Sequence, residues 1–176
     1  TKIFIPPERI EQATSILQRG LAHGVEFVLP VDFLLGDGTA AREIPQGEAQ
    51  FDVGPETIQV QADAVGRFLE FHRGQLASSK APAIAFHNGV FGLFEEAAFE
   101  TGTRAFIGEL KRMTEAGVEV YVGGGEGGTA LVRYGEPDWV THCFTAGGTI
   151  LKALGNEPIP YLKALYLRSL ALADTG

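Results

Sequence analysis

The sequence predicts an α/β fold: a three-layer, mostly parallel Rossmann-like sheet with helices on both faces. Short β-branched or aromatic stretches alternate with segments of helical periodicity along the chain. Residues 83–86 form a continuous apolar run, which is typical of a strand buried on both faces. Loops at 87–95, 123–129 and 145–149 each follow an apolar stretch and precede a helical pattern. Because the carboxyl ends of parallel strands meet at one edge of a sheet, these loops predict a ligand cleft there.

Periodicity and breaker residues place the elements of the N-terminal half. Apolar residues at three- and four-residue steps follow Pro6-Pro7 and stop near Gly24, which predicts a helix. Strand-forming residues then run up to Pro30. Asp52 or Thr57 is expected to cap the next helix, because both side chains accept hydrogen bonds from backbone N–H groups. In order, these elements are a helix over 10–21, a strand over 25–29, a polar surface excursion over 36–50, a turn over 51–57 and a helix over 57–73.

The C-terminal half repeats a unit of strand, glycine-bearing loop and helix. Residues 118–122 are β-branched and aromatic and run straight into glycines, which predicts a strand. Pro158 and Pro160 break the chain before a last apolar stretch. In order, these elements are a strand over 83–86, a helix from Phe99 to Gly117, a strand over 118–122, a helix over 130–134, a strand over 140–144, a helix over 150–154 and an apolar tail that ends at Leu170.

Composition excludes several classes of function. The chain has 176 residues, 45% of them hydrophobic, so one domain with a sizeable core is expected. No run reaches the roughly 18 apolar residues of a membrane span, so we expect no membrane partner. With 14 Lys+Arg against 22 Asp+Glu the net charge is −8, and no general affinity for nucleic acid is expected. The single cysteine, Cys143, excludes an internal disulfide and fits a reducing, cytoplasmic location.

The segment from Tyr121 to Thr129 carries the strongest functional signal. A strand, a glycine loop and a helix start form a common anion site, because the unpaired N–H groups of the first helical turn point at negative charge. The spacing matches neither the GxGxxG fingerprint nor the GxxxxGK[ST] loop, so a tight strand-to-helix turn stays open as the other interpretation. Glu126 lies inside the loop and would repel phosphate unless a cation such as Mg²⁺ lies between them. Its alternative is a solvated loop side chain.

Other candidates stand near the same predicted edge. Asn88 and Glu95 offer a donor and acceptors suited to phosphate or sugar hydroxyls, although one can support a turn and the other can start a helix. Tyr134 and Trp139 are able to stack a base, or to pack in the core. Cys143 is expected to be inert core. Because no nucleophile elbow, catalytic triad or histidine metal-ligand spacing is visible, direct phosphoryl transfer is the natural chemistry.

Five motifs follow one another along nearly the whole chain. They are Leu29-Pro30-Val31-Asp32-Phe33, Phe51-Asp52-Val53-Gly54-Pro55, Asn88-Gly89-x-x-Gly92-x-Phe94-Glu95, Gly123-Gly124-Gly125 and Thr145-x-Gly147-Gly148. In this order they resemble one known family, the nucleotide-binding C-terminal domain of phosphoglycerate kinase.

The resemblance implies phosphoryl transfer between 1,3-bisphosphoglycerate and ADP with Mg²⁺, a step of glycolysis in the cytoplasm. Its implied site residues are Leu29 for the adenine pocket, Asn88 near the nucleotide phosphates, Glu95 for the ribose hydroxyls, Gly123, Gly124 and Gly125 as the triple-glycine loop, Glu126 as ligand of the metal-nucleotide, and Gly147 and Gly148 as the catalytic helix start at the transferring phosphoryl group.

The chain also departs from the family. Val90 stands where the family usually has Pro, Glu126 where it has Asp, Gly127 where it has Thr or Ser, and Ala146 where it has Gly. The resemblance further implies that residues 1–176 are most of the C-terminal domain, and that the N-terminal domain gripping 3-phosphoglycerate and the first C-domain strands are absent. We therefore expect the sheet of this chain to be incomplete. The chain is then one segment of a longer enzyme or pairs with a second chain, and it is expected to be inactive alone.

Two alternatives stay open. One is a non-catalytic relative that binds nucleotide or a partner protein. The other, a nicotinamide-binding domain, is disfavoured because the GxGxxG fingerprint is missing.

Overall fold

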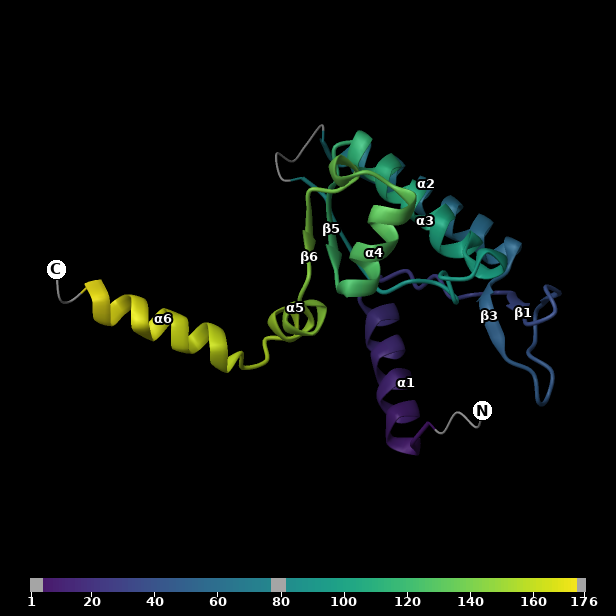
Figure 1. The fold of residues 1–176 in the computed structure, drawn as a ribbon, viewed down its shortest axis with the longest axis horizontal. Helices are drawn as coiled ribbons and strands as arrows, with labels where there is room; N and C mark the ends of the chain where they lie inside the picture. The colour runs from purple at the N-terminus through teal and green to yellow at the C-terminus, as the bar shows by residue number, and fades with distance from the viewer. Residues whose placement is uncertain (1–4, 77–81, 174–176) are drawn as a thin grey trace. The chain divides into compact units, whose positions relative to one another are not determined.

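The computed structural model describes residues 5–76 and 82–173, which divide into two compact units (Figure 1). Unit 1 comprises residues 1–78 and 91–109, and unit 2 comprises 79–90 and 110–176. The helices are α1 (Pro7–Ala22), α2 (Pro55–Leu76), α3 (Thr101–Glu115), α4 (Gly125–Tyr134), α5 (Gly147–Leu154) and α6 (Pro160–Ala173), with short 3-10 turns at Ala97–Phe99 and Pro137–Trp139. The strands are β1 (Phe33–Leu35), β2 (Ala40–Ala41), β3 (Gln50–Val53), β4 (Ile84–Asn88), β5 (Glu119–Gly123) and β6 (His142–Phe144).

Unit 1 contains a small antiparallel sheet in the order β2-β1-β3. Phe33 pairs with Val53, and Leu34 pairs with Asp52. The expected turn over 51–57 is therefore wrong at its start, since residues up to Val53 extend as a strand along β1. The pairing brings the segment before β1 against the start of α2.

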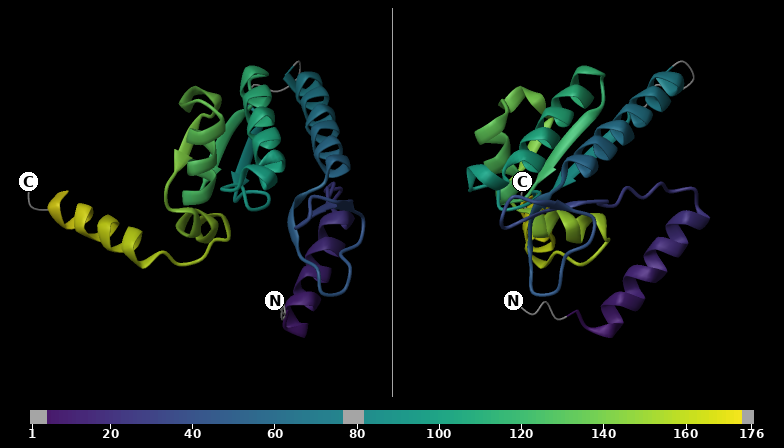
Figure 2. Two further views of the ribbon diagram at one scale, coloured as in Figure 1. Left: turned by 45° about the vertical axis from the view of Figure 1, so that its right-hand side comes forward. Right: turned by 90° about the vertical axis from the view of Figure 1, so that its right-hand side faces the viewer.

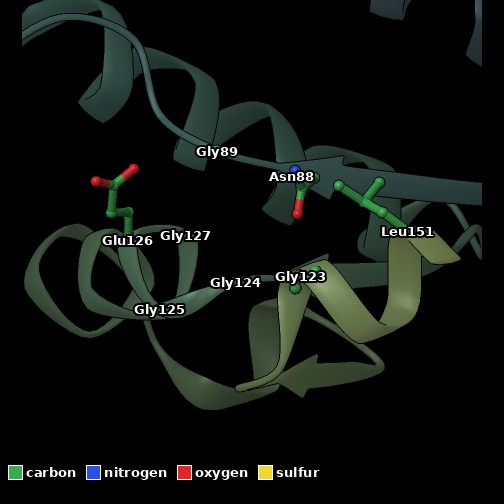
Figure 3. Close-up of a pocket in the computed structure, with 10 residues that line it drawn as sticks. Asn88, Gly89, Gly123, Gly124, Gly125, Glu126, Gly127 and Leu151 are labelled. Atoms are coloured by element: carbon green, nitrogen blue, oxygen red, sulfur yellow. The ribbon is translucent and has the colours of Figure 1, made fainter. Parts of the chain in front are cut away.

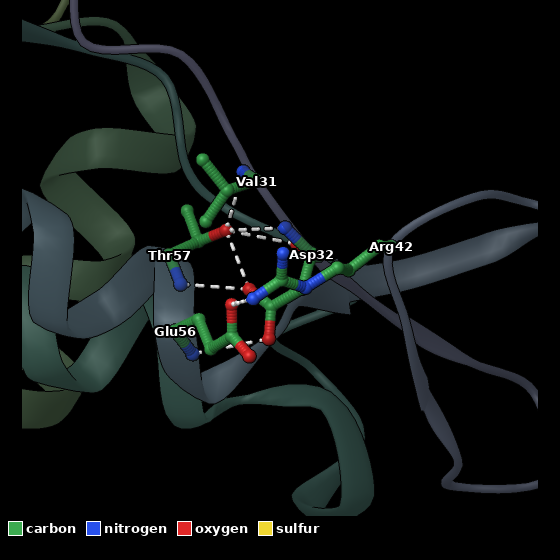
Figure 4. A network of polar contacts seen from close by, with 5 residues as sticks. All are labelled: Val31, Asp32, Arg42, Glu56 and Thr57. Atoms are coloured by element: carbon green, nitrogen blue, oxygen red, sulfur yellow. Dashed lines mark hydrogen bonds and ion pairs between the residues drawn. The ribbon is translucent and has the colours of Figure 1, made fainter.

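Asp32, which precedes β1, caps α2 from a distance in the sequence (Figure 4). Its carboxylate accepts hydrogen bonds from the backbone N–H groups of Glu56 at 3.0 Å and Thr57 at 2.7 Å. Both groups belong to the first helical turn, where no intrahelical acceptor is available. A Cβ on Gly54 would lie 2.2 Å from Asp32 Oδ2, so glycine is required where the carboxylate approaches.

Thr57 completes this network rather than capping the helix as expected. Its hydroxyl oxygen accepts from the backbone N–H groups of Val31 and Asp32, both at 3.0 Å, and lies 2.7 Å from Asp32 Oδ1. Asp32 and Thr57 are only 3% and 1% exposed. Burial alone would raise the pKa of Asp32, but the hydrogen bonds from Thr57 and Glu56 outweigh it and hold the pKa below its usual range.

Asp52 caps α3, not α2 as expected. It accepts from the backbone N–H of Gly102 at 2.8 Å and from that of Val53 at 2.8 Å. A Cβ on Gly102 would lie 2.4 Å from Asp52 Oδ1, so this approach also depends on glycine. Burial dominates here and raises the pKa of Asp52, although the two hydrogen bonds oppose it.

The two buried aspartates are expected to respond to pH in opposite directions. Because the pKa of Asp32 is lowered on folding, its stabilisation is present above the unfolded-state pKa and is lost as pH falls through the folded-state pKa. Because the pKa of Asp52 is raised, its contribution is present below the unfolded-state pKa and is lost as pH rises through the folded-state pKa. Urea unfolding of Asp32→Asn and Asp52→Asn between about pH 2 and pH 6 measures this. The stability gap to the parent should widen with pH for Asp32→Asn and narrow for Asp52→Asn; a gap independent of pH in either variant would contradict the assignment.

The predicted strand over 25–29 is wrong. This segment has no ladder partner among the described residues, and its apolar side chains stay open to solvent: Val25 is 48% and Leu29 59% exposed. Strand-forming residues need a neighbouring strand to take their backbone hydrogen bonds, and sheet pairing in unit 1 uses β1 instead. Residues 36–50 form a mostly exposed excursion as predicted, interrupted by β2.

Unit 2 is built on a parallel sheet in the order β4-β5-β6, which confirms the predicted fold class (Figure 2). Val120 and Val122 of β5 are completely buried, and α4 contacts β5 and β6. The start of β4 differs from the expectation of a strand buried on both faces, because Ile84 is 64% exposed. β4 is an edge of this sheet in the described part of the chain, which agrees with the predicted incomplete sheet.

Helices α4 and α5 begin earlier than predicted. Gly125 and Gly147 are already helical, so each glycine loop is mostly the first turn of a helix. Glycine has a low helix propensity, and periodicity therefore placed both starts at the first apolar residues. The apolar tail forms α6, and no helix in the described ranges is both long and apolar enough to cross a membrane.

Candidate functional site

The carboxyl ends of the three parallel strands meet at one cavity in unit 2. The register aligns Asn88 of β4 with Gly123 of β5, and Gly123 with Phe144 of β6. A cavity of about 290 Å³ opens there (Figure 3). It is lined by Asn88, Gly89, Gly123, Gly124, Gly125, Glu126, Gly127, Gly147, Gly148 and Leu151. The predicted loops at 123–129 and 145–149 therefore do open on the same edge as Asn88.

Gly124 makes the turn from β5 into α4. It has φ +94° and ψ 155°, a conformation that residues with a side chain rarely adopt. Its N–H donates to the carbonyl oxygen of Phe144 at 3.0 Å, which ties the turn to the end of β6. The turn therefore belongs to the sheet edge and is held in place by it.

Gly147 brings the start of α5 against the same turn. A Cβ at this position would lie 2.7 Å from Gly124 Cα, 2.8 Å from Gly124 N and 3.1 Å from Asn88 Oδ1. Two of these atoms belong to the backbone of Gly124, which cannot move aside as a flexible side chain can. The close approach of two helix starts depends on the absence of a side chain.

The described lining of the cavity offers backbone N–H groups and one carboxylate, that of Glu126. Neither α4 nor α5 has a side-chain hydrogen bond capping its N-terminus. The first i→i−4 bond of α4 is donated by Gly128 to Gly124 at 3.1 Å, so the N–H groups before it have no such acceptor. Among the described residues that line the cavity there is no lysine or arginine. Two helix N-termini without basic side chains are an arrangement suited to an anion held by main chain.

Glu126 is the carboxylate of this cavity. It is exposed in the first turn of α4, on the opposite side of the cavity from Leu151 (Figure 3). The described residues contain no cluster of three or more His, Cys, Asp or Glu side chains able to hold a metal. A single carboxylate suits Mg²⁺ that arrives on a phosphate chain, because Mg²⁺ is commonly held by one or two carboxylates plus phosphate oxygens. The donor set fits a metal-nucleotide and not a preformed metal site.

Most of the site residues expected from the sequence lie in this one cavity, and two lie in unit 1. Leu29 is in the extended segment after α1, and Glu95 is an exposed residue of the turn before Ala97–Phe99. Of the lining residues, Leu151 alone lies outside the three loops that the sequence predicted at this edge. Leu151 was recognisable in principle, since it stands four positions after Gly147 and therefore on the same face of a helix that starts there.

The two aromatic residues considered for base stacking have other neighbours. Lys111 Nζ lies 4.9 Å from the ring centre of Trp139, and Arg133 Cζ lies 5.2 Å from that of Tyr134. Neither ring is among the residues that line the cavity. Cys143 is half-buried and lies beneath Gly128, where a Cβ would come 3.3 Å from its sulfur.

Known proteins similar to this chain agree on one family. The family model described as phosphoglycerate kinase matches residues 2–157. A probable phosphoglycerate kinase of Caenorhabditis elegans is 34% identical over 160 residues, 85% of this chain and 35% of that protein. A cytosolic phosphoglycerate kinase of Triticum aestivum is 31% identical over 173 residues, 93% of this chain and 40% of that protein.

A solved structure supports the same grouping. Phosphoglycerate kinase from Coxiella burnetii superimposes with a TM-score of 0.68 at 27% identity, covering 90% of this chain and 39% of that one. The chain thus spans between about a third and two fifths of the relatives it matches. The match to the family model covers most of the chain, and the parallel sheet with its glycine-bearing strand ends accompanies it. The chain belongs to the phosphoglycerate kinase family.

Proposed function

We propose that this chain supplies the metal-nucleotide site for phosphoryl transfer between 1,3-bisphosphoglycerate and ADP, the phosphoglycerate kinase step of glycolysis. The observation that carries the proposal is the meeting of two uncapped helix N-termini, at Gly124 and Gly147, over one cavity. Phosphoryl transfer needs mainly positioning and neutralisation of charge, and aligned backbone N–H groups provide both.

The residues divide the work by position. Gly123, Gly124 and Gly125 receive the nucleotide phosphates, Asn88 lies on the wall beside them, and Gly147 and Gly148 meet the transferring phosphoryl group. Leu29 and Glu95 are proposed for adenine and ribose on the basis of the motifs alone. The Mg²⁺ ion, when bound, neutralises the phosphate charge, and Glu126 is the side chain that would hold it.

The other half of the reaction belongs to protein beyond these residues. We propose that residues 1–176 correspond to most of the nucleotide-binding C-terminal domain, and that a further segment of the same enzyme or a second chain binds 3-phosphoglycerate. The match covers 35% to 40% of the relatives' length, which supports this division because more than half of each relative lies outside it. A cytoplasmic location is proposed with it, in line with the wheat relative named cytosolic.

The substitution Glu126→Gln distinguishes between two roles of Glu126, a ligand of the metal ion and a solvated side chain without a ligand role. With Mg²⁺ present, the affinity for ADP is expected to fall about tenfold, because the ion loses its protein ligand. Without Mg²⁺, the variant should bind ADP slightly more tightly than the parent, because a charge that repels phosphate is gone. Isothermal titration of ADP with and without Mg²⁺ measures both arms, and Glu136→Gln, on the loop after α4, is the matched control. A variant that loses affinity equally in both conditions would rule out the metal role.

A non-catalytic relative that binds nucleotide is the alternative to be tested. Two substitutions favour it: Glu126 stands where the family usually has Asp and Gly127 where it has Thr or Ser, and both line the cavity. A coupled assay of ATP formation with the full-length gene product distinguishes the two. Turnover supports the kinase, whereas binding of Mg-ADP without turnover supports the relative.

A further inference from the structure

The first turn of α4 lies directly on one row of the parallel sheet. The register places His87, Val122 and Cys143 side by side on neighbouring strands, and side chains in such a row point to the same face. A Cβ on Gly127 would lie 3.0 Å from Val122 Cγ1 and 3.9 Å from His87 Cδ2. The imidazole ring therefore lies next to the start of α4, on the face of the sheet that α4 covers.

The same ring also contacts the turn that follows β4. His87 forms a hydrogen bond with the backbone of Gly89. Burial lowers the pKa of His87, while this hydrogen bond opposes the shift, as expected when the ring donates to a carbonyl oxygen. Gly89 has φ +100°, a backbone conformation that glycine adopts readily, and its Cβ position is open space with no atom within 4 Å. Its carbonyl oxygen lies 3.7 Å from the Cβ position of Gly127.

Gly89 and Gly127 both line the glycine cavity, one after β4 and the other in α4. We infer that His87 is a positioning residue of this cavity: its hydrogen bond to Gly89 and its packing beside Gly127 fix the spacing between these two walls. The inference rests on the proposed function only for the ligand, since the contacts that define it are made within the protein. Without the bond, Gly89 is free to sample the wide range of conformations open to glycine, and the cavity loses its fixed width.

Two variants with the same number of side-chain heavy atoms test the inference. Asparagine and leucine both branch at Cγ, but only asparagine carries a donor close to the position of the imidazole Nδ1. His87→Asn is therefore expected to keep a hydrogen bond to Gly89, and His87→Leu removes it. If His87 were only a packing residue, leucine would be the better replacement in both stability and binding, because it is the better strand former and has no polar group to bury.

A positioning role predicts that the variant with the higher stability is not the variant with the higher affinity. His87→Leu should resist urea at least as well as His87→Asn, yet bind Mg-ADP about fivefold more weakly, roughly the weight of one ordinary hydrogen bond. Titration calorimetry and urea unfolding of the same samples give both values. Equal affinities, or tighter binding by the leucine variant, would overturn the inference.

A second measurement needs no ligand. The order parameter S² of the Gly89 backbone amide, measured by 15N NMR relaxation in the free chain, should stay at about 0.85 in His87→Asn and fall below about 0.6 in His87→Leu, because the turn loses its bond to residue 87. Equal order parameters would overturn the inference whatever the cavity binds. If the order parameters separate the variants but the parent chain binds no Mg-ADP, the proposed function fails while the positioning role of His87 stands.

Discussion

Replacing Gly147 by alanine is expected to weaken the binding of Mg-ADP by about 30-fold. The new Cβ would lie 2.7 Å from Gly124 Cα, a distance that real Cβ atoms essentially never show. The start of α5 must then move away from the turn into α4, and forced overpacking of this kind costs roughly 1–3 kcal/mol. Because both helix starts face the cavity, the displacement appears as lost affinity. Titration calorimetry of the chain with Mg-ADP measures it.

Gly108→Ala is the matched control for this change. Gly108 also lies inside a helix, α3, and no atom lies within 4 Å of its Cβ position. Alanine should be accepted there and should stabilise the helix by up to about 1 kcal/mol, with Mg-ADP binding unchanged. If Gly147→Ala bound Mg-ADP as the parent does, the close approach of α4 and α5 would not be needed for binding, and the proposed site would be wrong.

Asp32→Ala is expected to have the largest effect on stability, a loss of about 3 kcal/mol from the free energy of unfolding. The substitution removes the acceptor of two N–H groups at the start of α2, the buried one of Thr57 among them, while the Thr57 hydroxyl keeps the Asp32 carbonyl oxygen at 2.9 Å as an acceptor. Loss of an N-cap costs roughly 0.5–2 kcal/mol, and a buried polar group left without its partner costs roughly 1–3 kcal/mol. Urea unfolding gives the total, and hydrogen exchange at the Glu56 and Thr57 amides shows whether the start of α2 is where protection is lost.

Asp63→Ala provides the contrast on the same helix. Its carboxylate accepts only an exposed hydrogen bond from Gln59 at 2.8 Å, so a change within about 0.5 kcal/mol is expected.

Thr57→Val tests the network further, since its hydroxyl contacts Asp32. The double variant Asp32→Ala with Thr57→Val should lose less than the sum of the two single losses. Additive losses would mean that the two side chains act independently.

The sequence predicted the parts of this molecule that local patterns encode. The amphipathic helices over 57–73 and from Phe99 to Gly117 correspond to α2 and α3, and the strand before the glycines corresponds to β5. Motif order also placed the cavity, because Asn88 and the two glycine loops stand at the ends of strands that the fold makes parallel. These features depend on residues close together in the chain or on a rule of topology.

The failures have a common physical origin in long-range partners. Residues 25–29 have strand-forming side chains, but a strand exists only where a neighbour supplies hydrogen bonds. Asp32 caps a helix that begins more than twenty positions later, and Asp52 caps one fifty positions away. Neither link leaves a local pattern like the S/T-x-x-E capping box. The early starts of α4 and α5 were missed because glycine predicts a loop from the sequence alone. At these two positions the neighbouring sheet edge imposes helical geometry on the glycines.

A phosphate site made of main chain should depend on pH and on chemical modification differently from a site made of charged side chains. Glu126 is the single titratable side chain among the described residues that line the cavity. Backbone N–H groups neither gain nor lose protons in water, so from neutral to mildly alkaline pH the affinity for a phosphate chain should follow the ionisation of the ligand. Reagents that block lysine or arginine should leave this cavity intact. Substitutions should damage the site chiefly where a glycine is replaced by a residue with a side chain. Almost every residue supplies a backbone N–H group, but only glycine leaves the space that the ligand or the neighbouring backbone occupies.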